Sequence, residues 1–469
     1  MTLRLTNSLG GRLEEFRPLD AGQVRMYSCG PTVYGPAHIG NFRAFVFADL
    51  VHRYLLWSGY RVTWVMNITD VDDRIIRDLA AGTAESLDDL TAPHIDRFVT
   101  DLAALRIGPP DVMPRATAHV AEMAGLIARL LERGHAYRTD DGSIFFRLAS
   151  WPAYGALARL DPAQSRRSER VAEDDYGKDD IRDFALWKGP RDGEPAWQTE
   201  IGSGRPGWHI ECSAMSMKYL GESFDIHTGG VDLIFPHHEN EIAQSEAATG
   251  ARFVGTWLHN AHLHLGGQKM ARREGNIYRP VDIYEQGYRP AALRYALLAT
   301  HYRAPLEFGD DTLVHAAAAV ERLTTCVLAL EAYAETGPDD LALGATLLAA
   351  REAFAVAMDD DLNVSAGLAA VFELVRELNR RLAERTLSTG DARAAAEALR
   401  GIDRVLGVID EPDELPDGAA ELLEQRAAAR GVRNWAESDR LRDALAELGV
   451  TVEDTPDGQR WRLKESIDV

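Results

Sequence analysis

The feature that most constrains the fold of this chain is a strand–loop–helix–strand pattern near its N-terminus. Residues 24–29 alternate as a short strand, and Gly30 opens a loop rich in glycine and proline. The run 38–41 (HIGN) leads into a helical stretch over 42–57, and residues 60–68 are typical of a second strand. This unit indicates a parallel α/β sheet. Free N–H groups and the helix dipole favour phosphate binding where such a helix begins.

The rest of the chain divides around this unit. Strand patterns return at 224–228 and 257–265, which predicts that the sheet resumes after an insertion, and helical periodicity dominates beyond about residue 312. A chain of 469 residues is long enough for two to four domains. We predict a Rossmann-like α/β domain over 1–112 and 205–311, an inserted α+β segment over 113–204, an α-helical bundle over 312–410 and a small mixed α/β module over 419–469.

The C-terminal module has its own signals. Asn434 and Glu437 have the spacing of a capping box for a helix that ends near Gly449, and two alternating segments around 456–458 predict a hairpin. Basic and aromatic residues are frequent here, which is compatible with an RNA-contacting face, although by themselves they fit a solvated helix with two core tryptophans better. These residues are Arg426, Arg430, Arg433, Arg440, Arg442, Arg460, Arg462 and Lys464, with Trp435 and Trp461.

Cysteine usage and charge restrict the class of protein. Three widely separated cysteines argue against a disulfide framework and for a reducing cytoplasm. The net charge of −22 argues weakly against a nucleic-acid partner, because phosphate binding favours basic surfaces. A local basic face can still exist on a protein of negative net charge. The N-terminus lacks the basic and apolar pattern of a secretion signal. We also expect no membrane span, because no stretch approaches about 18 consecutive apolar residues.

One group of residues has the composition of a metal site. The run 235–242 (FPHHENEI) opens with a proline that favours a helix start, so His237 and Glu241 share a helix face, whereas His238 is matched with Ile242. A hydrogen-bonded surface pair would show the same spacing. Together with Cys29 and Cys212 the pair forms a set suited to tetrahedral zinc, although the long ligand spacing is not diagnostic. The third cysteine, Cys326, lies in an apolar helical run and is interpreted as core.

A second group has the composition of a triphosphate site. His38 lies at the first strand–helix junction, and the basic run 269–273 (KMARR) follows a late strand of the same predicted sheet. Each motif is common alone, and His38 could simply cap its helix. Placed on two sides of a triphosphate, the imidazole and the basic loop would stabilise charge as pyrophosphate leaves.

The sequence closely resembles the cysteinyl-tRNA synthetases, class I enzymes with a nucleotide-binding α/β fold. The resemblance covers nearly the whole chain and is carried by separate blocks: 26–34 (MYSCGPTVY), 38–41 (HIGN), 67–73 (NITDVDD), 207–215 (GWHIECSAM), 225–230 (DIHTGG), 235–244 (FPHHENEIAQ) and 359–364 (DDDLNV).

The resemblance implies a role for particular residues. The zinc ligands of the family fall on Cys29, Cys212, His237 and Glu241. Its ATP contacts fall on His38, Gly40, Asn41, Gly229, Gly230, Asp232, Lys269 and Arg272, of which His38, Asn41, Lys269 and Arg272 would be catalytic. Its amino-acid pocket falls on Gly30, Thr69 and Trp208. The second ATP motif, usually Lys-Met-Ser-Lys-Ser, departs from the family at Ala271, Arg272 and Arg273.

The same resemblance implies the reaction. ATP with Mg²⁺ would activate L-cysteine to cysteinyl-adenylate, and the 3′ terminal adenosine of tRNA(Cys) would accept the cysteine, in a cytoplasmic monomer. One Zn²⁺ per chain would select the substrate thiolate over serine, because a pocket based on shape alone discriminates such near-isosteres only by roughly 10².

Two further functions are compatible with the sequence. A related ligase could transfer cysteine to a small amine acceptor, but such ligases end soon after the catalytic domain, whereas here a helical bundle and a basic module follow. A non-catalytic, zinc-stabilised RNA-binding protein would need the altered 271–273 loop to be inactive.

Overall fold

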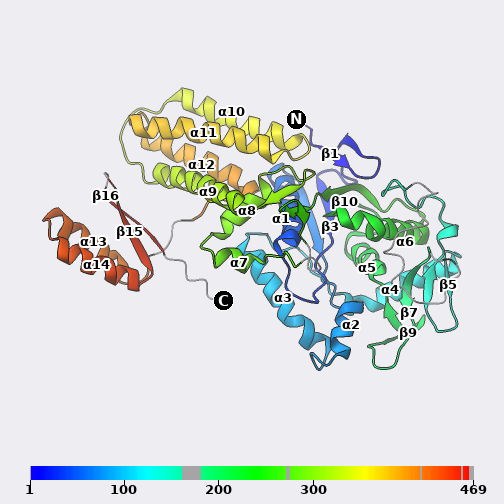
Figure 1. The fold of residues 1–469 in the computed structure, drawn as a ribbon. Coiled ribbons are helices and arrows are strands. Elements are labelled where there is room, and N and C mark those ends of the chain that lie inside the picture. The colour runs from blue at the N-terminus through cyan, green and yellow to red at the C-terminus, as the bar shows by residue number, and fades with distance from the viewer. Residues whose placement is uncertain are drawn as a thin grey trace.

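The centre of the protein is a sheet of four parallel strands (Figure 1). The computed structural model describes residues 2–160, 180, 182–270, 275–411, 415–455 and 458–463. The strand order is β11-β10-β3-β4, and all three pairings are parallel. This confirms the predicted α/β class. The strands are β3 (Gln23–Ser28), β4 (Arg61–Met66), β10 (Phe224–Gly230) and β11 (Val254–Asn260).

Helices cover both faces of this sheet. Helix α1 (Ile39–Trp57) connects β3 to β4 on one face, and α6 (Glu239–Thr249) connects β10 to β11 on the other. Side chains alternate along β3, so Met26 packs with the α1 core while Tyr27 packs with α6 and α5 (Trp208–Leu220). The chain therefore leaves the adjacent strands β3 and β10 in opposite directions. Such a switch point opens a crevice at the carboxyl ends of the strands.

Two predicted boundaries differ from the structure. Helix α1 begins at Ile39, three residues before the predicted start, because His38 acts as its N-cap. The strand predicted over 257–265 is two strands, since β11 ends at Asn260 and the next residue, Ala261, donates its N–H to Tyr302 O at 2.8 Å. The second piece, β12 (Leu263–Leu265), joins a separate sheet with β13 (Gln268–Lys269) and β14 (Leu306–Phe308).

The region between β4 and β10 contributes to both faces of the sheet: its second helix packs with α1, and the part after that helix packs beside α6. Helices α2 (Asp73–Ala80) and α3 (Leu87–Ala104) follow β4, and α4 (Val120–Glu132) packs against α5 and α6. An antiparallel sheet of order β5-β6-β7-β9-β8 follows, with strands Ala136–Arg138, Ile144–Phe146, Phe184–Lys188, Gly202–Pro206 and Trp197–Thr199 in that order. A small hairpin, β1 (Arg4–Asn7) and β2 (Arg12–Glu15), precedes the main sheet.

A bundle of long helices packs on the α1 side of the sheet (Figure 1). Its apolar faces join the core that contains α1, so buried residues from Leu3 to Ile409 form one continuous cluster, and Cys326 is core as predicted. Two short helices lead into the bundle. The helices are α7 (Pro280–Tyr284), α8 (Pro290–Leu298), α9 (Asp310–Glu331), α10 (Leu341–Asp359), α11 (Val364–Glu384) and α12 (Thr389–Leu406).

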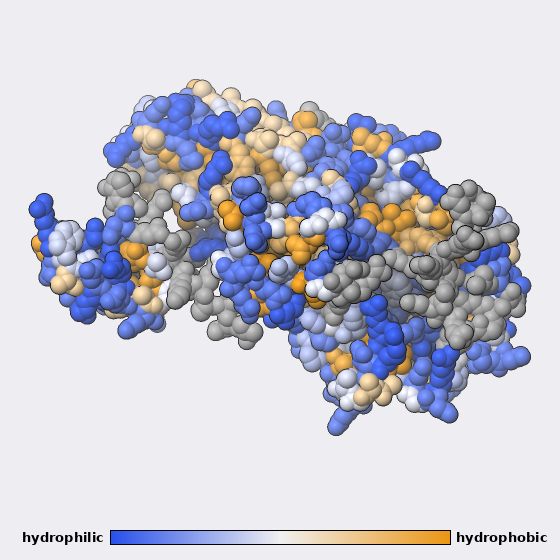
Figure 2. Space-filling view, in the orientation of Figure 1, coloured by the Kyte–Doolittle hydropathy of each residue, from blue (hydrophilic) through white to orange (hydrophobic). Residues whose placement is uncertain are grey.

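The expectation that no segment is apolar enough to span a membrane needs correction. Helices α9 and α10 are long and apolar enough by length and composition alone. Both pack against α11 or α12, as bundle helices do. Less than half of each apolar stretch is buried, and α10 exposes Leu341, Leu348 and Val356, which adds to the apolar side chains visible over the bundle in Figure 2.

The C-terminal module has its own small core. It consists of α13 (Ala419–Gly431), α14 (Trp435–Glu447), β15 (Val450–Thr455) and β16 (Gly458–Leu463). The predicted hairpin is present, and Asn434 accepts a hydrogen bond from Glu437 N at 3.3 Å. Arg426 is buried against Asp454, whereas Trp435 is half exposed with Arg430 over its ring at 5.4 Å. The predicted Lys464 lies outside the described residues.

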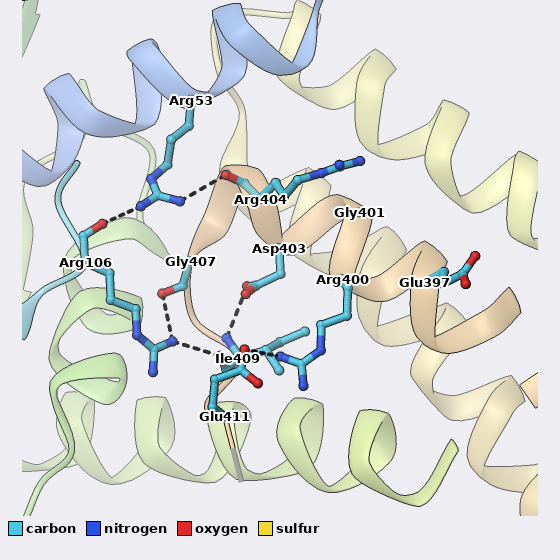
Figure 3. Close-up of a pocket in the computed structure, with 10 residues that line it drawn as sticks. All are labelled: Arg53, Arg106, Glu397, Arg400, Gly401, Asp403, Arg404, Gly407, Ile409 and Glu411. Carbon is cyan, nitrogen blue, oxygen red and sulfur yellow. Dashed lines mark hydrogen bonds and ion pairs between the residues drawn. The ribbon is translucent and has the colours of Figure 1, made fainter. Parts of the chain in front are cut away.

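A buried ion pair holds the sheet and the bundle together. Asp49 of α1 accepts Nη2 of Arg294 at 2.5 Å and Nε of Arg53 at 2.7 Å, and both Asp49 and Arg294 are fully buried. The Arg294 guanidinium also donates to Leu406 O at the end of α12 and to Leu105 O beyond α3. Beside this pair lies the arginine-rich pocket of Figure 3, in which the guanidinium groups of Arg53, Arg106 and Arg400 donate to backbone carbonyls or a carboxylate.

We expect Asp49→Ala to destabilise the sheet–bundle unit by about 3–5 kcal/mol, because it leaves the buried Arg294 charge without its partner. The measurement is the urea midpoint followed by circular dichroism. A double variant, Asp49→Ala with Arg294→Leu, should recover part of the loss, since the orphaned charge is gone. Glu15→Ala, which breaks an exposed pair with Arg17, is the control and should not shift the midpoint. Equal effects of Asp49→Ala and Glu15→Ala would contradict the assignment.

Candidate active site at the carboxyl edge of the sheet

A cavity of about 610 Å³ lies at the carboxyl edge of the parallel strands. Its walls come from the loop after β3, the start of α1, the end of β10, the start of α5 and the β12–β13 hairpin. The structure thus brings together most of the residues chosen from the sequence. Those that line the cavity are Cys29, Gly30, His38, Gly40, Asn41, Trp208, Gly230, Asp232 and Lys269.

Four donor groups meet behind one end of this cavity. Ligand atoms of Cys29, Cys212, His237 and Glu241 all lie within 4.8 Å of one another, and all four residues are buried. The two sulfurs are 3.8 Å apart, and His237 Nε2 is 3.1 Å from Glu241 Oε1. Cys29 follows β3, Cys212 lies in α5, and the remaining two lie in or beside α6. This buried set of two thiols, an imidazole and a carboxylate could hold a metal ion.

The protonation of the cluster shows how its charges depend on one another. Burial raises the pKa of Cys29, whereas the hydrogen bond from Cys29 lowers the pKa of Cys212 to about 6. Burial opposes ionisation of Glu241, but His227 and His237 outweigh it and lower the pKa of Glu241 to about 2. Burial lowers the pKa of His237, but Cys212 and Glu241 outweigh it and raise that pKa to about 10. The thiolate and the carboxylate therefore stabilise a positive charge between them, which is the charge that a bound metal ion would supply.

A second donor set shares two members with the first. Ligand atoms of Cys29, His227, His238 and Glu241 also lie within 4.8 Å of one another. Helical spacing favoured His237 over His238, but the structure places His238 Nε2 3.3 Å from Cys29 Sγ. His227 reaches Glu241 from β10 at 3.0 Å, a contact that depends on how α6 packs against β10 and not on helical spacing. The signal for His227 in the sequence was a histidine within the predicted strand 224–228.

The three residues predicted for the amino-acid pocket differ in their positions. Gly30 lines the cavity, and a side chain there would not fit, because its Cβ would lie 1.6 Å from Asn67 O. Trp208 also lines the cavity and stacks on His237, with ring centroids 4.3 Å apart. Thr69 does not line it. Instead Thr69 Oγ1 donates to Glu211 at 2.9 Å, and this buried carboxylate, which sequence reasoning missed, faces the cavity.

His38 occupies the N-cap of α1, which is the simpler of the two roles that the sequence allowed for it. Its Nδ1 accepts from Asn41 N at 3.3 Å, and Asn41 Oδ1 accepts from His38 N at 3.1 Å. The cap fixes the tautomer, because an accepting Nδ1 leaves the proton on Nε2. Gly40 keeps the turn tight, since a Cβ there would lie 3.0 Å from the imidazole. The cap thus presents an N–H donor to an anion at the helix start.

The second ATP motif begins at Lys269, whose Nζ lies 3.0 Å from Asp232 Oδ2. Asp232 follows the two glycines that end β10. A Cβ at Gly230 would lie 2.5 Å from Asp232 Oδ1, and one at Gly229 would lie 2.7 Å from His238. Gly230 therefore allows close packing at the cavity wall, whereas the predicted Gly229 does not line the cavity and packs against His238. The predicted Arg272, with Ala271 and Arg273, lies outside the described residues.

Comparison with known proteins covers the whole chain. Residues 15–318 match the model of the class I (C) tRNA synthetase catalytic domain, 353–410 match the DALR domain, and 412–462 match the cysteinyl-tRNA ligase anticodon binding domain. A cysteine–tRNA ligase of Symbiobacterium thermophilum is 46% identical over 98% of this chain and 100% of that protein. Another, of Alkalilimnicola ehrlichii, is 47% identical over 98% and 99%.

The chain belongs to the cysteine–tRNA ligase family.

Solved structures agree on the fold. Methionyl-tRNA synthetase of Mycobacterium tuberculosis with methionyl-adenylate has a TM-score of 0.59 at 17% identity, over 82% of this chain and 90% of that chain. A LeuRS of Agrobacterium radiobacter, in a ternary complex with tRNA and LeuAMS, has a TM-score of 0.58 at 13% identity, over 84% of each chain. The class I fold of the family is therefore also the fold of this chain.

We expect Gly30→Ala to lower amino-acid-dependent exchange of pyrophosphate into ATP roughly 10²-fold, because an added methyl group displaces the loop that carries Cys29. The measurement is exchange of labelled pyrophosphate at saturating ATP. Gly344→Ala is the matched control, since a Cβ there meets open space within α10. Unchanged exchange in Gly30→Ala would show that the loop tolerates the displacement.

Proposed function

We propose that this protein charges tRNA(Cys) with L-cysteine in two steps. ATP with Mg²⁺ first converts cysteine to cysteinyl-adenylate and pyrophosphate, and the 3′ terminal adenosine of the tRNA then takes the cysteine and releases AMP. The observation that carries the proposal is the composition of one cavity. The cluster with the two cysteines lies behind one of its walls, and the capped start of α1 and Lys269 lie in other walls. Full-length similarity to cysteine–tRNA ligases supports the same activity.

The residues of the cavity fit the first step. As the cysteine carboxylate attacks the α-phosphorus, negative charge grows on the phosphate oxygens and on the leaving pyrophosphate. His38 can donate from Nε2, and Lys269 can donate once Asp232 releases it. Asn41 holds the imidazole in place through the reciprocal cap. We assign Arg272 to the same task because it carries a positive charge. Its planar guanidinium replaces the ammonium group of the lysine that is usual at this position.

We assign one Zn²⁺ to Cys29, Cys212, His237 and Glu241. Of the two donor sets, this one offers two sulfurs, and zinc prefers thiolate ligands. When bound, zinc supplies a site that takes a thiolate far better than a hydroxyl group. Trp208 stacks on His237 and borders the cavity, so it would orient the substrate side chain toward the cluster. Glu211 is placed to accept a hydrogen bond from the substrate ammonium group.

The remaining parts then take roles in tRNA binding. The 113–204 insertion would contact the acceptor end, the 312–410 bundle would support the tRNA, and the 419–469 module would bind the anticodon, with the protein acting as a cytoplasmic monomer. The match of 412–462 to an anticodon binding domain supports tRNA as acceptor over a small amine. A non-catalytic RNA-binding role is disfavoured because the cavity retains both the phosphate-facing and the thiol-bearing groups.

The test is aminoacylation of purified tRNA with cysteine and serine in parallel, with zinc content measured on the same sample. We expect cysteinyl-tRNA, one zinc per chain, and discrimination against serine well beyond the roughly 10² that shape alone provides. Cysteine-dependent pyrophosphate exchange without tRNA charging, but with transfer to a sugar amine, would favour the small-amine ligase. Absence of exchange would contradict both enzymes.

Substitutions should distinguish the two donor sets. We expect Cys212→Ser and His237→Asn to reduce bound zinc well below one per chain, because each removes a ligand. His238→Asn is the matched control, since His238 is equally buried and belongs only to the second set. Zinc is measured by mass spectrometry on protein with a native circular dichroism spectrum. Loss of zinc in His238→Asn with retention in His237→Asn would assign the metal to the second set.

A further inference from the structure

Two basic side chains lie opposite each other in the wall that the inserted sheet contributes to the cavity. Lys188 ends β7, and Arg205 is its direct partner in the antiparallel strand β9. Both line the cavity, yet only 9% and 6% of their side chains are exposed. Like charges directly opposite in a sheet repel one another, and burial makes the repulsion stronger. The arrangement is therefore costly to the fold unless an anion compensates it.

The compensating anion comes from a different part of the chain. Asp73, the first residue of α2, receives Lys188 Nζ at 2.8 Å on one oxygen and Arg205 Nη1 at 2.8 Å on the other. Arg205 Nε also contacts Glu194 at 3.0 Å. Burial tends to raise the pKa of Asp73, but the two cations outweigh it and hold that pKa below its ordinary value. Half of the Asp73 side chain is exposed, so this carboxylate bridges two deeply placed cations from the solvent side.

More positive charge surrounds this pair. Arg74 and Arg77 of α2 also line the cavity, with Arg74 placed over the ring of Tyr34 at 4.9 Å. Of the five lysines and arginines that line the cavity among the described residues, four thus lie on α2 or the inserted sheet, and the fifth, Lys269, lies on the β12–β13 hairpin. Asp72 and Asp73 line the same side of the cavity, so cations outnumber carboxylates there in a chain of net charge −22.

We propose that Lys188 and Arg205 bind a phosphodiester group at the 3′ end of the tRNA, and that Asp73 occupies this position until the RNA phosphate replaces it. The inference rests on the proposed function. The planar guanidinium of Arg205 suits a phosphate as well as a carboxylate, since both present two oxygens to it. Arg205 lies three residues before Trp208, so a phosphate held there is adjacent to the wall assigned to the amino acid. That position suits the acceptor strand, whose terminal ribose must reach the activated carboxyl group.

A purely structural role and an ATP-binding role for these residues would give different results. If the three residues only tie α2 to the inserted sheet, removing any of them weakens the fold and affects both reaction steps. If the cations bind the ATP triphosphate, which has the same phosphate chemistry, their loss raises the KM for ATP. The phosphodiester site alone predicts that removing either cation raises the KM for tRNA and that removing the Asp73 charge does not.

The first experiment compares Lys188→Gln, Arg205→Gln and Asp73→Asn in the full-length enzyme. We expect each cation variant to raise the KM for tRNA roughly tenfold, as for the loss of a charge-assisted hydrogen bond, with the KM for ATP in pyrophosphate exchange unchanged. Asp73→Asn should leave the KM for tRNA unchanged or lower it, because a competing anion is gone. Lys218→Gln, which removes a cation paired with Glu122 outside the cavity, is the control.

A raised KM for tRNA in Asp73→Asn together with a lowered melting temperature in all three variants would overturn the proposal in favour of a structural tie. A raised KM for ATP in the cation variants would overturn it in favour of the triphosphate.

A second experiment does not depend on the folding of any variant. The unmodified enzyme is given tRNA in which the terminal internucleotide phosphates are neutral methylphosphonates. We expect the KM to rise with this tRNA, and the penalty of Arg205→Gln to vanish, because the charge that Arg205 binds is absent. Equal KM values for the two tRNAs would overturn the inference while the proposed function stands. If the unmodified enzyme does not charge natural tRNA at all, the proposed function itself fails.

Discussion

The parallel pairing of β3 with β10 is the constraint on which the site depends. Ser28 lies opposite Thr228, so the two strands end side by side, and their connecting helices leave on opposite faces of the sheet. The groups at the end of each strand are thereby brought to one edge: Cys29 and the capped start of α1 after β3, and the two glycines that end β10 with Asp232 beyond them. The candidate metal cluster and the capped start of α1 lie at one edge of the sheet because two strands far apart in sequence end at the same level.

Charge in this cavity is arranged as replaceable pairs. Lys269 contacts Asp232, and Lys188 and Arg205 share Asp73, with each carboxylate about half exposed. Such pairs hold the cations in place and keep each of them next to a counter-charge. When a phosphate replaces the carboxylate, one anion takes the place of another, so the net cost of desolvating the cations is small. The candidate metal cluster is different, since Glu241 and both cysteines are buried. An acidic protein can therefore bind highly charged substrates through local fields that its net charge does not describe.

The sequence predicted what depends on local spacing and missed what depends on pairing. The strand–loop–helix–strand unit and the bundle follow from periodicity, and the four-residue spacing of His237 and Glu241 placed both at the cluster. His227 escaped because it reaches Glu241 only through the packing of α6 against β10. Lys188 and Arg205 escaped because cross-strand register is not visible in a single sequence. The start of α1 was placed late because a histidine is an uncommon cap residue.

The continuity of the main core has a consequence for how such a protein can be rebuilt over evolutionary time. The sheet and the bundle share one set of buried residues from Leu3 to Ile409, and Arg294 ties helix ends from both parts to Asp49. Neither part can be exchanged without uncovering the other. Residues 419–455 and 458–463 contain a core of their own and form a separable unit. Exchange of this module therefore leaves the main core covered, whereas exchange of the sheet or the bundle alone does not.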